Sequence, residues 1–512
     1  MKWIKRLLRL LFSRFFVIAC MILLQFGVIL FAVSHFSGSF TWFYLLCFAI
    51  SIVVVLIVVN RRDLNAAYKL AVSVPILLFP LFGGCVYLIL YAGLLNRRVY
   101  RRFGDLKNLE AEQYGLVGDG RELYQSLPYE IRSQFTALQH ITSYPVFDGT
   151  ETRFYPLGEE MFPVMKEALE NAKDYIYLEY FIVEFGTMWG EILGILQKKA
   201  SEGVDVRLIY DGIGTVRRLP WGYEKHLEKM GIRCRVYNPL LPLTAAWQNI
   251  RDHRKILVVD GKIAFTGGIN LTDEYINLRQ NLGHWKDTGI SVRGAAALSF
   301  AVMFRCLWKT IGNENEPILP PDEPIPAPVF DGLVVPYGDN PYANIPVGRD
   351  IYLGAITQAR DSIQIMTPYF IVDDETLTTL KLAAARGVRI TVITPHIGDK
   401  WYVHMVTRSY YAELLEAGIE VFEYSPGFLH AKNMITDGTV GICGSVNFDY
   451  RSFYLQLECG VMMYRTSAIA QMQEDFRQLL SVSRRVTDED VRKVNWFVRI
   501  LRSVLRIFAP VM

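Results

Sequence analysis

Acidic residues are almost absent from the first part of this 512-residue sequence. Residues 1–103 contain twelve Lys and Arg residues but a single acid, Asp63. Charged residues of either sign make up only 21% of the chain, and the mean hydropathy is +0.20. Such a composition excludes a disordered chain, which would be poor in apolar residues. It also argues against a purely soluble protein, because so many apolar side chains must be buried or face lipid.

Cysteines are few, with seven residues scattered along the chain and no two of them close in sequence. An odd number without clustering excludes a disulfide framework and offers no metal-ligand spacing. Scattered free thiols fit a reducing, cytoplasmic setting for most of the chain. We therefore expect no metal ion and no other cofactor.

The small formal net charge of +3 conceals an uneven distribution. Residues 1–103 carry a net charge of +11, residues 484–512 carry +4, and the stretch between them carries −12. Basic ends suit the surface of an anionic membrane. The acidic centre argues against a duplex nucleic-acid binder, which would normally present a basic surface. We expect an anionic membrane, and no nucleic acid, among the partners.

Two uncharged runs near the N-terminus predict transmembrane helices. Residues 15–33 and 42–59 each approach the roughly 20 residues needed to cross a bilayer. Basic residues precede the first run and follow the second, which places both flanks in the cytoplasm. A cleaved signal peptide is the alternative for the first run, but no small-residue cleavage site follows it.

A third apolar stretch, 70–95, is uncharged but contains Pro75, Pro80 and a Gly-Gly pair, which we expect to break a helix. Four arginines follow it closely. A full span would carry these arginines and the rest of the chain outside, whereas a re-entrant or interfacial hairpin returns them to the cytoplasm. We favour the hairpin, so that 1–103 forms a membrane region.

The rest of the chain contains an internal repeat. Ala172-Lys-Asp-Tyr-Ile-Tyr-Leu matches Ala359-Arg-Asp-Ser-Ile-Gln-Ile, and Gly231-Ile matches Gly418-Ile at the same offset of 187 residues. Each copy reads as strand, helix, strand, helix, strand. This pattern predicts an α/β fold with two mixed-sheet lobes related by a pseudo-twofold axis. We place the lobes at 104–316 and 331–483, joined by a Pro-rich linker at 317–330.

Both copies carry the same octapeptide pattern, H-x-K-x4-D. The copies read His253-Arg-Lys255-Ile-Leu-Val-Val-Asp260 and His430-Ala-Lys432-Asn-Met-Ile-Thr-Asp437. Each aspartate precedes a glycine, which predicts a tight hairpin. Histidine and lysine two residues apart on one strand would share a face of the sheet.

An imidazole and an ammonium on one face suit a phosphate ester as substrate. The lysine would hold phosphoryl oxygens, while one histidine attacks phosphorus and the other protonates the leaving alkoxide. The roles would then reverse for the acceptor alcohol. The sequence does not rank the two histidines as nucleophile. We include Asp260 and Asp437 in the catalytic set, although an aspartate before glycine is also ordinary turn chemistry.

Further residues recur downstream of each motif. The spacing predicts neutral phosphate-binding donors at four positions: Gly268, Asn270, Ser445 and Asn447. Asp287 and Glu458 both start the pattern acid-x-Gly-apolar, and we expect them to orient His253 and His430 by fixing the tautomer of each imidazole. The alternative for both acids is a salt bridge at a strand end.

The twin motifs resemble those of the phospholipase D superfamily. Longer segments resemble bacterial cardiolipin synthases: Gly427-Phe-Leu-His-Ala-Lys432, Asn447-Phe-Asp-Tyr-Arg-Ser452, Thr367-Pro-Tyr-Phe, Gly267-Gly-Ile-Asn-Leu-Thr-Asp-Glu-Tyr, and Tyr68-Lys-Leu with Pro80-Leu-Phe-Gly-Gly. The resemblance covers nearly the whole chain. Thr436 and Cys443 depart from the first copy, but neither touches a proposed catalytic atom.

This resemblance implies transfer of a phosphatidyl group from one phosphatidylglycerol to another. The products are cardiolipin and glycerol, formed through a phosphohistidine intermediate. It makes His253 the expected nucleophile and His430 the acid and base. It also implies a multi-pass protein of the bacterial plasma membrane, with the catalytic body on the cytoplasmic side.

Other functions remain open at this point. A phosphatidylserine synthase or a hydrolytic phospholipase D would share the mechanism and differ in the acceptor. A nuclease and a non-catalytic membrane scaffold are more distant alternatives. The sequence makes no prediction about the oligomeric state.

The C-terminal segment 484–512 predicts a basic amphipathic helix. Arg492, Arg499 and Arg506 recur every seven residues, opposite apolar residues such as Phe497 and Ile500. Such a helix can lie in an anionic interface. The alternative is a helix docked on the body, with its arginines in solvent.

Overall fold

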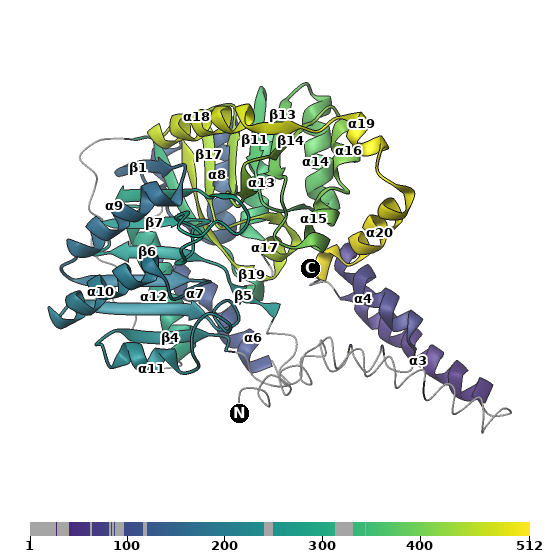
Figure 1. Ribbon diagram of the computed structural model, residues 1–512, viewed down its shortest axis with the longest axis horizontal. Coiled ribbons are helices and arrows are strands. Elements are labelled where there is room, and N and C mark those ends of the chain that lie inside the picture. Colours follow the sequence, from purple (N-terminus) through teal and green to yellow (C-terminus); the bar gives the residue numbers. More distant parts are fainter. Residues whose placement is uncertain are drawn as a thin grey trace. The chain divides into compact units, whose positions relative to one another are not determined.

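The computed structural model describes residues 40–61, 64–80, 97–115, 120–239, 249–312, 331–343 and 345–511, together with Gly27, Gly83 and Tyr87. The chain forms two compact units (Figure 1). The first comprises 1–100, 240–249 and 507–512. The second comprises 101–239 and 250–506 and contains both copies of the repeat.

In the first unit, two helices pack against each other: α3 (Phe40–Asn60) and α4 (Ala66–Leu78). Asn65 caps α4, its side chain accepting a hydrogen bond from the Tyr68 amide at 2.7 Å. Buried Val58 and Ile76 lie in the apolar cluster that joins the two helices. The short 3₁₀ helix η4 (Ala509–Val511) also contacts α4.

The expectation that Pro75 breaks the helix was wrong, because α4 continues through it to Leu78. Pro75 lies near the last turn and removes one donor, while its own carbonyl still accepts a hydrogen bond from the Phe79 amide at 3.0 Å. The helix ends just before Pro80, whose carbonyl accepts a hydrogen bond from Ser51 of α3 at 2.8 Å. The remainder of the predicted hairpin, beyond residue 80, lies outside the described residues except for Gly83 and Tyr87.

In the described parts of the chain, no helix meets the length and apolarity that crossing a bilayer requires. The predicted span at 42–59 falls within α3 and gains no support from this finding. The other predicted span, 15–33, lies outside the described residues apart from Gly27.

The second unit is built on two mixed sheets, one from each copy of the repeat (Figure 1). The first sheet has seven strands in the order β1 (Thr150–Tyr155), β9 (Gly289–Gly294), β7 (Ile263–Gly267), β6 (Lys255–Val259), β2 (Tyr175–Tyr180), β3 (Asp205–Asp211) and β4 (Arg233–Tyr237). Strands β2, β3 and β4 run parallel, and the others join them in antiparallel pairs.

The second sheet repeats this order and adds one strand at its edge. It consists of β10 (Leu333–Gly338), β20 (Cys459–Tyr464), β17 (Val440–Gly444), β16 (Asn433–Thr436), β11 (Ser362–Met366), β13 (Arg389–Pro395), β14 (Glu420–Tyr424) and β21 (Ser483–Arg485). Each of its first seven strands therefore has a counterpart at the same place in the first sheet. The predicted duplicated α/β body is confirmed.

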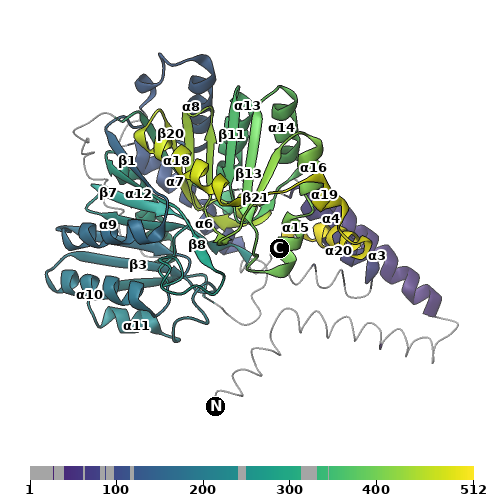
Figure 2. The same ribbon diagram turned by 45° about the horizontal axis from the view of Figure 1, so that its top comes forward.

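Helices connect and cover the strands (Figure 2). Those of the first copy are α9 (Gly158–Glu170), α10 (Thr187–Ser201), α11 (Tyr223–Glu228) and α12 (Ala297–Gly312). Those of the second are α13 (Val347–Gln358), α14 (Asp374–Ala385), α15 (Trp401–Thr407), α16 (Tyr411–Glu416), α17 (Tyr450–Tyr454) and α18 (Ser467–Ser481). The chain enters this unit through α6 (Arg97–Gly104), α7 (Leu106–Gly115), η1 (Arg121–Leu123) and α8 (Tyr129–Thr142), and leaves it through α19 (Asp488–Arg492) and α20 (Trp496–Ile507).

Successive side chains of β2 point to opposite faces of the first sheet, and helices cover both faces. Ile176 and Leu178 share an apolar cluster with residues of α9 and α10, whereas Tyr177 stacks on Phe304 of α12 at 4.6 Å between ring centroids. Every residue of β2 is buried. A parallel strand covered by helices on both faces is the arrangement expected of an α/β sheet.

The two lobes share elements at their junction. Helix α12 of the first copy contacts β10 of the second sheet, and α18 of the second copy contacts β1 of the first. Helix α8, which precedes the first sheet in sequence, packs on α13 of the second lobe. The predicted Pro-rich linker 317–330 lies outside the described residues.

Candidate active site

Two short parallel ribbons, each made from both lobes, bring the sequence motifs together. Strand β5 (Arg251–Asp252) pairs with β19 (Gln456–Leu457), and β8 (His284–Lys286) pairs with β15 (Gly427–Leu429). In both ribbons the histidine of an H-x-K motif follows one strand and a predicted carboxylate follows the other. The register therefore sets His253 level with Glu458, and His430 level with Asp287.

Each histidine is fixed to the opposite lobe through its backbone and its ring. The His253 amide donates to the Leu457 carbonyl at 2.9 Å, and Nδ1 of its ring lies 2.9 and 3.0 Å from the two carboxylate oxygens of Glu458. The His430 amide donates to the Lys286 carbonyl at 2.7 Å, and its Nδ1 lies 2.6 Å from Oδ2 of Asp287. The two predicted carboxylates thus contact the imidazoles, and each contact crosses between lobes.

These contacts determine which ring nitrogen is available for chemistry. An ionised carboxylate only accepts hydrogen bonds, so with Asp287 and Glu458 ionised Nδ1 of each histidine carries the proton and donates it. Nε2 then carries the lone pair. A carboxylate in this position also stabilises the imidazolium that forms when Nε2 takes up a proton.

The two motif lysines lie beside the histidines and are almost completely buried. Nζ of Lys255 donates to the His253 carbonyl, and Nζ of Lys432 donates to the His430 carbonyl. Nζ of Lys432 also lies 2.8 Å from Nδ1 of His430. The prediction that histidine and lysine share one strand was wrong in detail. The histidines precede β6 and β16, at the point where the chain leaves a ribbon between lobes and enters its own sheet.

Burial and mutual repulsion shift the ionisation of these four groups. Burial, and then the positive charge of Lys432, lower the pKa of His430 to about 4, and Asp287 opposes this shift. Burial and Lys255 hold the pKa of His253 well below its usual value. Burial also lowers the pKa of Lys255 to about 8 and that of Lys432 to about 7. Both imidazoles are therefore neutral near pH 7 in the free site.

The structure places the motif aspartates away from the histidines, and we correct their assignment to the catalytic set. Asp260 lies five residues beyond Lys255 along an extended strand, or about 16 Å at the usual rise. Its carboxylate accepts backbone hydrogen bonds from Lys173, Asp174 and Tyr175 at 2.8–2.9 Å. It therefore ties the hairpin after β6 to the start of β2.

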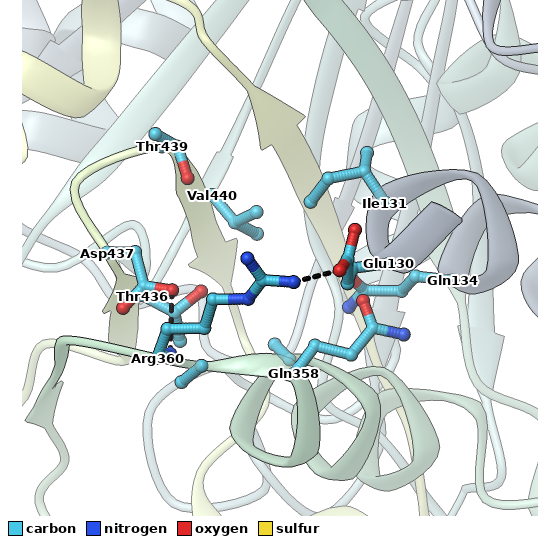
Figure 3. Close-up of a pocket in the computed structure, with 11 residues that line it drawn as sticks. Glu130, Ile131, Gln134, Gln358, Arg360, Thr436, Asp437, Thr439 and Val440 are labelled. Atoms are coloured by element: carbon cyan, nitrogen blue, oxygen red, sulfur yellow. Dashed lines mark hydrogen bonds and ion pairs between the residues drawn. The ribbon is translucent and has the colours of Figure 1, made fainter. Parts of the chain in front are cut away.

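Asp437 does the same in the second lobe, accepting from the amides of Arg360, Asp361 and Ser362 at 2.8–2.9 Å. It lines a pocket with Glu130 and Arg360, and none of the described residues lining this pocket is a histidine (Figure 3). Both aspartates adopt a left-handed backbone, with φ of 51° and 52°, as the predicted Asp-Gly hairpins require.

Of the four predicted phosphate donors, three are occupied within the protein. The Gly268 amide donates to the Thr288 carbonyl at 3.0 Å. Asn270 accepts from the Ile182 amide at 3.0 Å and donates to the hydroxyl of Tyr275 at 2.8 Å. These residues therefore build the site without offering their polar groups to a ligand.

Ser445 is the third, because its hydroxyl donates to Glu458 and accepts from the Cys459 amide at 3.0 Å. Gly268 occupies the position of Ser445 in the first copy. A Cβ atom on Gly268 would lie 2.0 Å from Oδ1 of Asp287, so glycine is required there. The fourth, Asn447, is buried, and its Oδ1 has no hydrogen-bond partner within the described chain. This oxygen is an acceptor, so it can bind a hydroxyl of a ligand but cannot donate to a phosphate oxygen.

Sequence reasoning missed the aromatic surroundings of the histidines. Rings of Tyr275, Trp285 and Phe428 lie 5.5–5.8 Å from that of His430, while Phe181 lies 5.1 Å from His253. No spacing rule connects these residues, since they come from four separate loops or strands. They exclude water around the imidazoles and strengthen the electrostatic effects there.

It also missed Arg254, the residue between His253 and Lys255, which is completely buried. Its guanidinium donates to the carbonyls of Glu458 and Asp339 and lies 3.8 Å from Glu179. Arg254 therefore fixes the backbone at Glu458, the residue whose carboxylate contacts His253. The second motif has Ala431 at this place, so the repeat gave no signal for it.

No group of three or more His, Cys, Asp or Glu side chains is arranged to hold a metal ion within the described residues. Two lysines and two carboxylates lie beside the motif histidines.

Comparison with known proteins identifies the family. A family model described as "Cardiolipin synthase, PLD-like domain" matches residues 165–293 and 352–480, one match to each lobe. A cardiolipin synthase of Halalkalibacterium halodurans is 32% identical over 487 residues, which cover 94% of this chain and 96% of that protein. An uncharacterized protein of Streptococcus mutans is 40% identical over 419 residues, covering 80% of this chain and 90% of the relative.

Among solved structures, a phosphatidylserine synthase of Haemophilus influenzae aligns with a TM-score of 0.54 at 14% identity, covering 73% of this chain and 97% of that one. This likeness concerns the fold. The family match to both lobes and the nearly full-length relatives show that this chain belongs to the cardiolipin synthase family, with its duplicated phospholipase D-like body.

Proposed function

We propose that this protein is a phosphatidyltransferase that converts two molecules of phosphatidylglycerol into cardiolipin and glycerol. The observation that carries the proposal is the pair of inter-lobe contacts, His253 with Glu458 and His430 with Asp287. They give two neutral imidazoles of defined tautomer next to two lysines. Cardiolipin synthases that align over most of the chain support the choice of substrates.

In the first half-reaction, Nε2 of His253 attacks the phosphorus of one phosphatidylglycerol, and the bond from phosphorus to the glycerol oxygen breaks. His430 donates a proton to that oxygen, and glycerol leaves. Lys255 and Lys432 stabilise the charge on the phosphoryl oxygens. The substrate phosphate brings a negative charge into the site, which raises the pKa of His430 and allows it to act as an acid.

In the second half-reaction, His430 takes the proton from a headgroup hydroxyl of a second phosphatidylglycerol. That oxygen attacks phosphorus, the bond from phosphorus to Nε2 of His253 breaks, and cardiolipin forms. Each carboxylate holds the tautomer and stabilises the cationic form of the imidazole that it contacts. The assignment of His253 as nucleophile follows the family resemblance.

The deciding experiment follows the fate of phosphatidylglycerol labelled in its headgroup, incubated with the purified full-length protein in lipid nanodiscs. One labelled glycerol should be released for each cardiolipin formed. Formation of phosphatidic acid would instead indicate a hydrolytic phospholipase D. A requirement for added serine would indicate a phosphatidylserine synthase, the activity named for the similar fold from Haemophilus influenzae.

The membrane setting is part of the same proposal. The region 1–103 attaches the enzyme to the bacterial plasma membrane by its apolar segments, with the lobes 104–316 and 331–483 on the cytoplasmic side. Twelve basic residues and one acid in this region, and apolar side chains exposed along α3, support attachment to an anionic bilayer. The proposal includes no nucleic-acid partner, which agrees with the net charge of −12 between residues 104 and 483.

A further inference from the structure

Helix α20 exposes a row of apolar side chains, although three others on the helix, Val498, Leu501 and Leu505, are partly buried. Trp496, Phe497, Ile500, Val504 and Ile507 are 38–70% exposed and lie along one stripe of the helix. We call these five residues the α20 stripe. A surface helix normally turns such a stripe toward the core.

Two of the three arginines of α20 face neighbouring helices of the body, and the third bonds to the chain just before α20. Arg506 forms an ion pair with Glu413 of α16, and its guanidinium lies 4.1 Å from the ring centroid of Tyr410. Arg502 is half-buried near Arg408, which follows α15. Arg499 donates to the backbone carbonyl of Val494 at 3.0 Å. The alternative of a docked helix with its arginines in solvent was wrong, because Arg502 and Arg506 face the protein, while the helix in an anionic interface stays a prediction.

The helices that hold α20 also reach the active site. Helix α15, which begins just after Lys400, contacts β12 (Phe370–Ile371), and β12 pairs with β18 (Phe448–Asp449), which directly follows Asn447 of the candidate site. Next to Lys400, Trp401 is 64% exposed. Helix α15 therefore connects the side of the active site that contains Asn447 to α20, and α16 holds α20 through Glu413. Both views show α15 beside α20 (Figures 1 and 2).

We propose that the α20 stripe inserts into the interface of an anionic phospholipid bilayer and positions the rim of the active site at the lipid surface. A bilayer fits the stripe because it begins with Trp496 and Phe497, side chains that favour the boundary between headgroups and acyl chains. It also fits the charge, since Arg499 of α20 and the preceding Arg492 and Lys493 are exposed, and α20 contains no acid.

This inference rests on the proposed phosphatidyl transfer, because it concerns how the same site reaches its lipid. A substrate that stays in a bilayer must be met at the surface, whereas a short-chain phosphatidylglycerol dispersed as monomers can diffuse into the site. The α20 stripe should therefore matter for the first substrate and not for the second.

The test uses the full-length protein carrying Ile500→Ser and Val504→Ser, with phosphatidylglycerol supplied either in vesicles or as dispersed short-chain monomers. Removing two exposed apolar side chains should lower the rate on vesicles by about tenfold or more and leave the rate on monomers unchanged. Leu382→Ser is the matched control, because Leu382 is 58% exposed on α14 and lies outside the stripe. It should change neither rate.

Equal rates of the stripe variant and the parent on vesicles would overturn the inference, and so would an equal loss on both substrates. If the parent protein had no activity on monomers, the proposed function itself would be wrong. Failure of the proposed function is therefore distinguishable from failure of the inference about α20.

A direct measurement uses nitroxide labels at Ile500→Cys and, as a control on α18, Arg477→Cys, with the signal of the labelled parent subtracted. In phosphatidylglycerol vesicles, the label at 500 should become accessible to oxygen and protected from a nickel chelate, while the label at 477 should not. A label at 500 that is already shielded before lipid is added would show that another segment of the chain, or a second copy, covers the stripe. That result would overturn the inference.

Discussion

Glu458 in the second lobe lies 2.9 Å from Nδ1 of His253 in the first lobe, and the two residues are 205 positions apart. The contact arises because β5 and β19 pair in parallel and leave both residues at the same level of the ribbon. The second ribbon repeats the arrangement for His430 and Asp287. Neither lobe alone contains a motif histidine together with the carboxylate that contacts it, so the proposed chemistry requires both lobes.

The crossed contacts predict different kinetic defects for the two carboxylates. With His253 as nucleophile, Glu458→Gln should slow formation of the phosphatidyl-enzyme, because it disturbs the tautomer of the attacking ring. Asp287→Asn should impair proton transfer through His430 in both halves of the reaction. We expect losses of about 10²- to 10⁴-fold in turnover, as for the corresponding change in a catalytic triad.

Single-turnover measurements with labelled phosphatidylglycerol would separate the two steps for each variant. If Asp287→Asn slowed mainly the formation of the phosphatidyl-enzyme while Glu458→Gln impaired both steps, His430 rather than His253 would be the nucleophile.

Replacing either motif histidine with alanine should reduce cardiolipin formation by at least about 10³-fold, since nucleophile and acid act as a unit. The variants should differ in what accumulates. His430→Ala keeps the attacking ring and should trap a covalent phosphatidyl-enzyme, detectable as label retained on the denatured protein. His253→Ala should trap none. The loss of activity at unchanged thermal stability distinguishes a chemical from a folding defect, and full activity of either variant would exclude this mechanism.

The hairpin aspartates should affect stability more than chemistry. Asp260→Ala or Asp437→Ala leaves three backbone amides without their acceptor, and we expect a loss of about 2 kcal/mol or more in the free energy of unfolding. Thermal unfolding of each variant would measure this loss. Turnover per folded molecule at low temperature should stay within about threefold of the parent, because the carboxylates lie far from the histidines. A loss of turnover comparable to that of the histidine variants would restore them to the catalytic set.

The lysines predict an alkaline decline in activity. The pKa values of Lys432 and Lys255 are lowered by burial to about 7 and about 8, so both lose their charge in the free enzyme as the pH rises through this range. The ratio kcat/KM, which reports the free enzyme, should therefore begin to fall above about pH 7, where Lys432 loses its charge. Lys432→Arg keeps its charge at every accessible pH and should move this decline to higher pH, even if the rate at its optimum is lower.

Asp339 predicts a dependence of stability on pH. Burial raises its pKa to about 8, so between about pH 4 and pH 8 the folded protein holds a proton that the unfolded chain has released. The contribution of Asp339 to the free energy of unfolding is fully present below the pKa that this residue has in the unfolded chain. It is lost as the pH rises toward 8. Asp339→Asn retains an oxygen that can accept from the Gly348 amide, a contact of 2.7 Å, and does not titrate.

The stability of Asp339→Asn relative to the parent should therefore increase with pH, by up to about 1.4 kcal/mol per unit. Unfolding by denaturant at pH 5 and pH 8 would measure the difference. A constant difference between the two proteins would show that Asp339 is ionised in the folded state.

The sequence by itself determined the duplication, the α/β class, the two H-x-K pairs and the Asp-Gly hairpins, because repeats, strand patterns and turn residues are local properties. It also pointed to Asp287 and Glu458 as partners of the histidines. Only the tertiary structure decided that each carboxylate serves the histidine of the other lobe, since this follows from strand pairing between segments more than 140 residues apart. The roles of Arg254, Ser445 and the apolar side of α20 were likewise decided by burial and by what each side chain faces, and these are properties of the packed molecule.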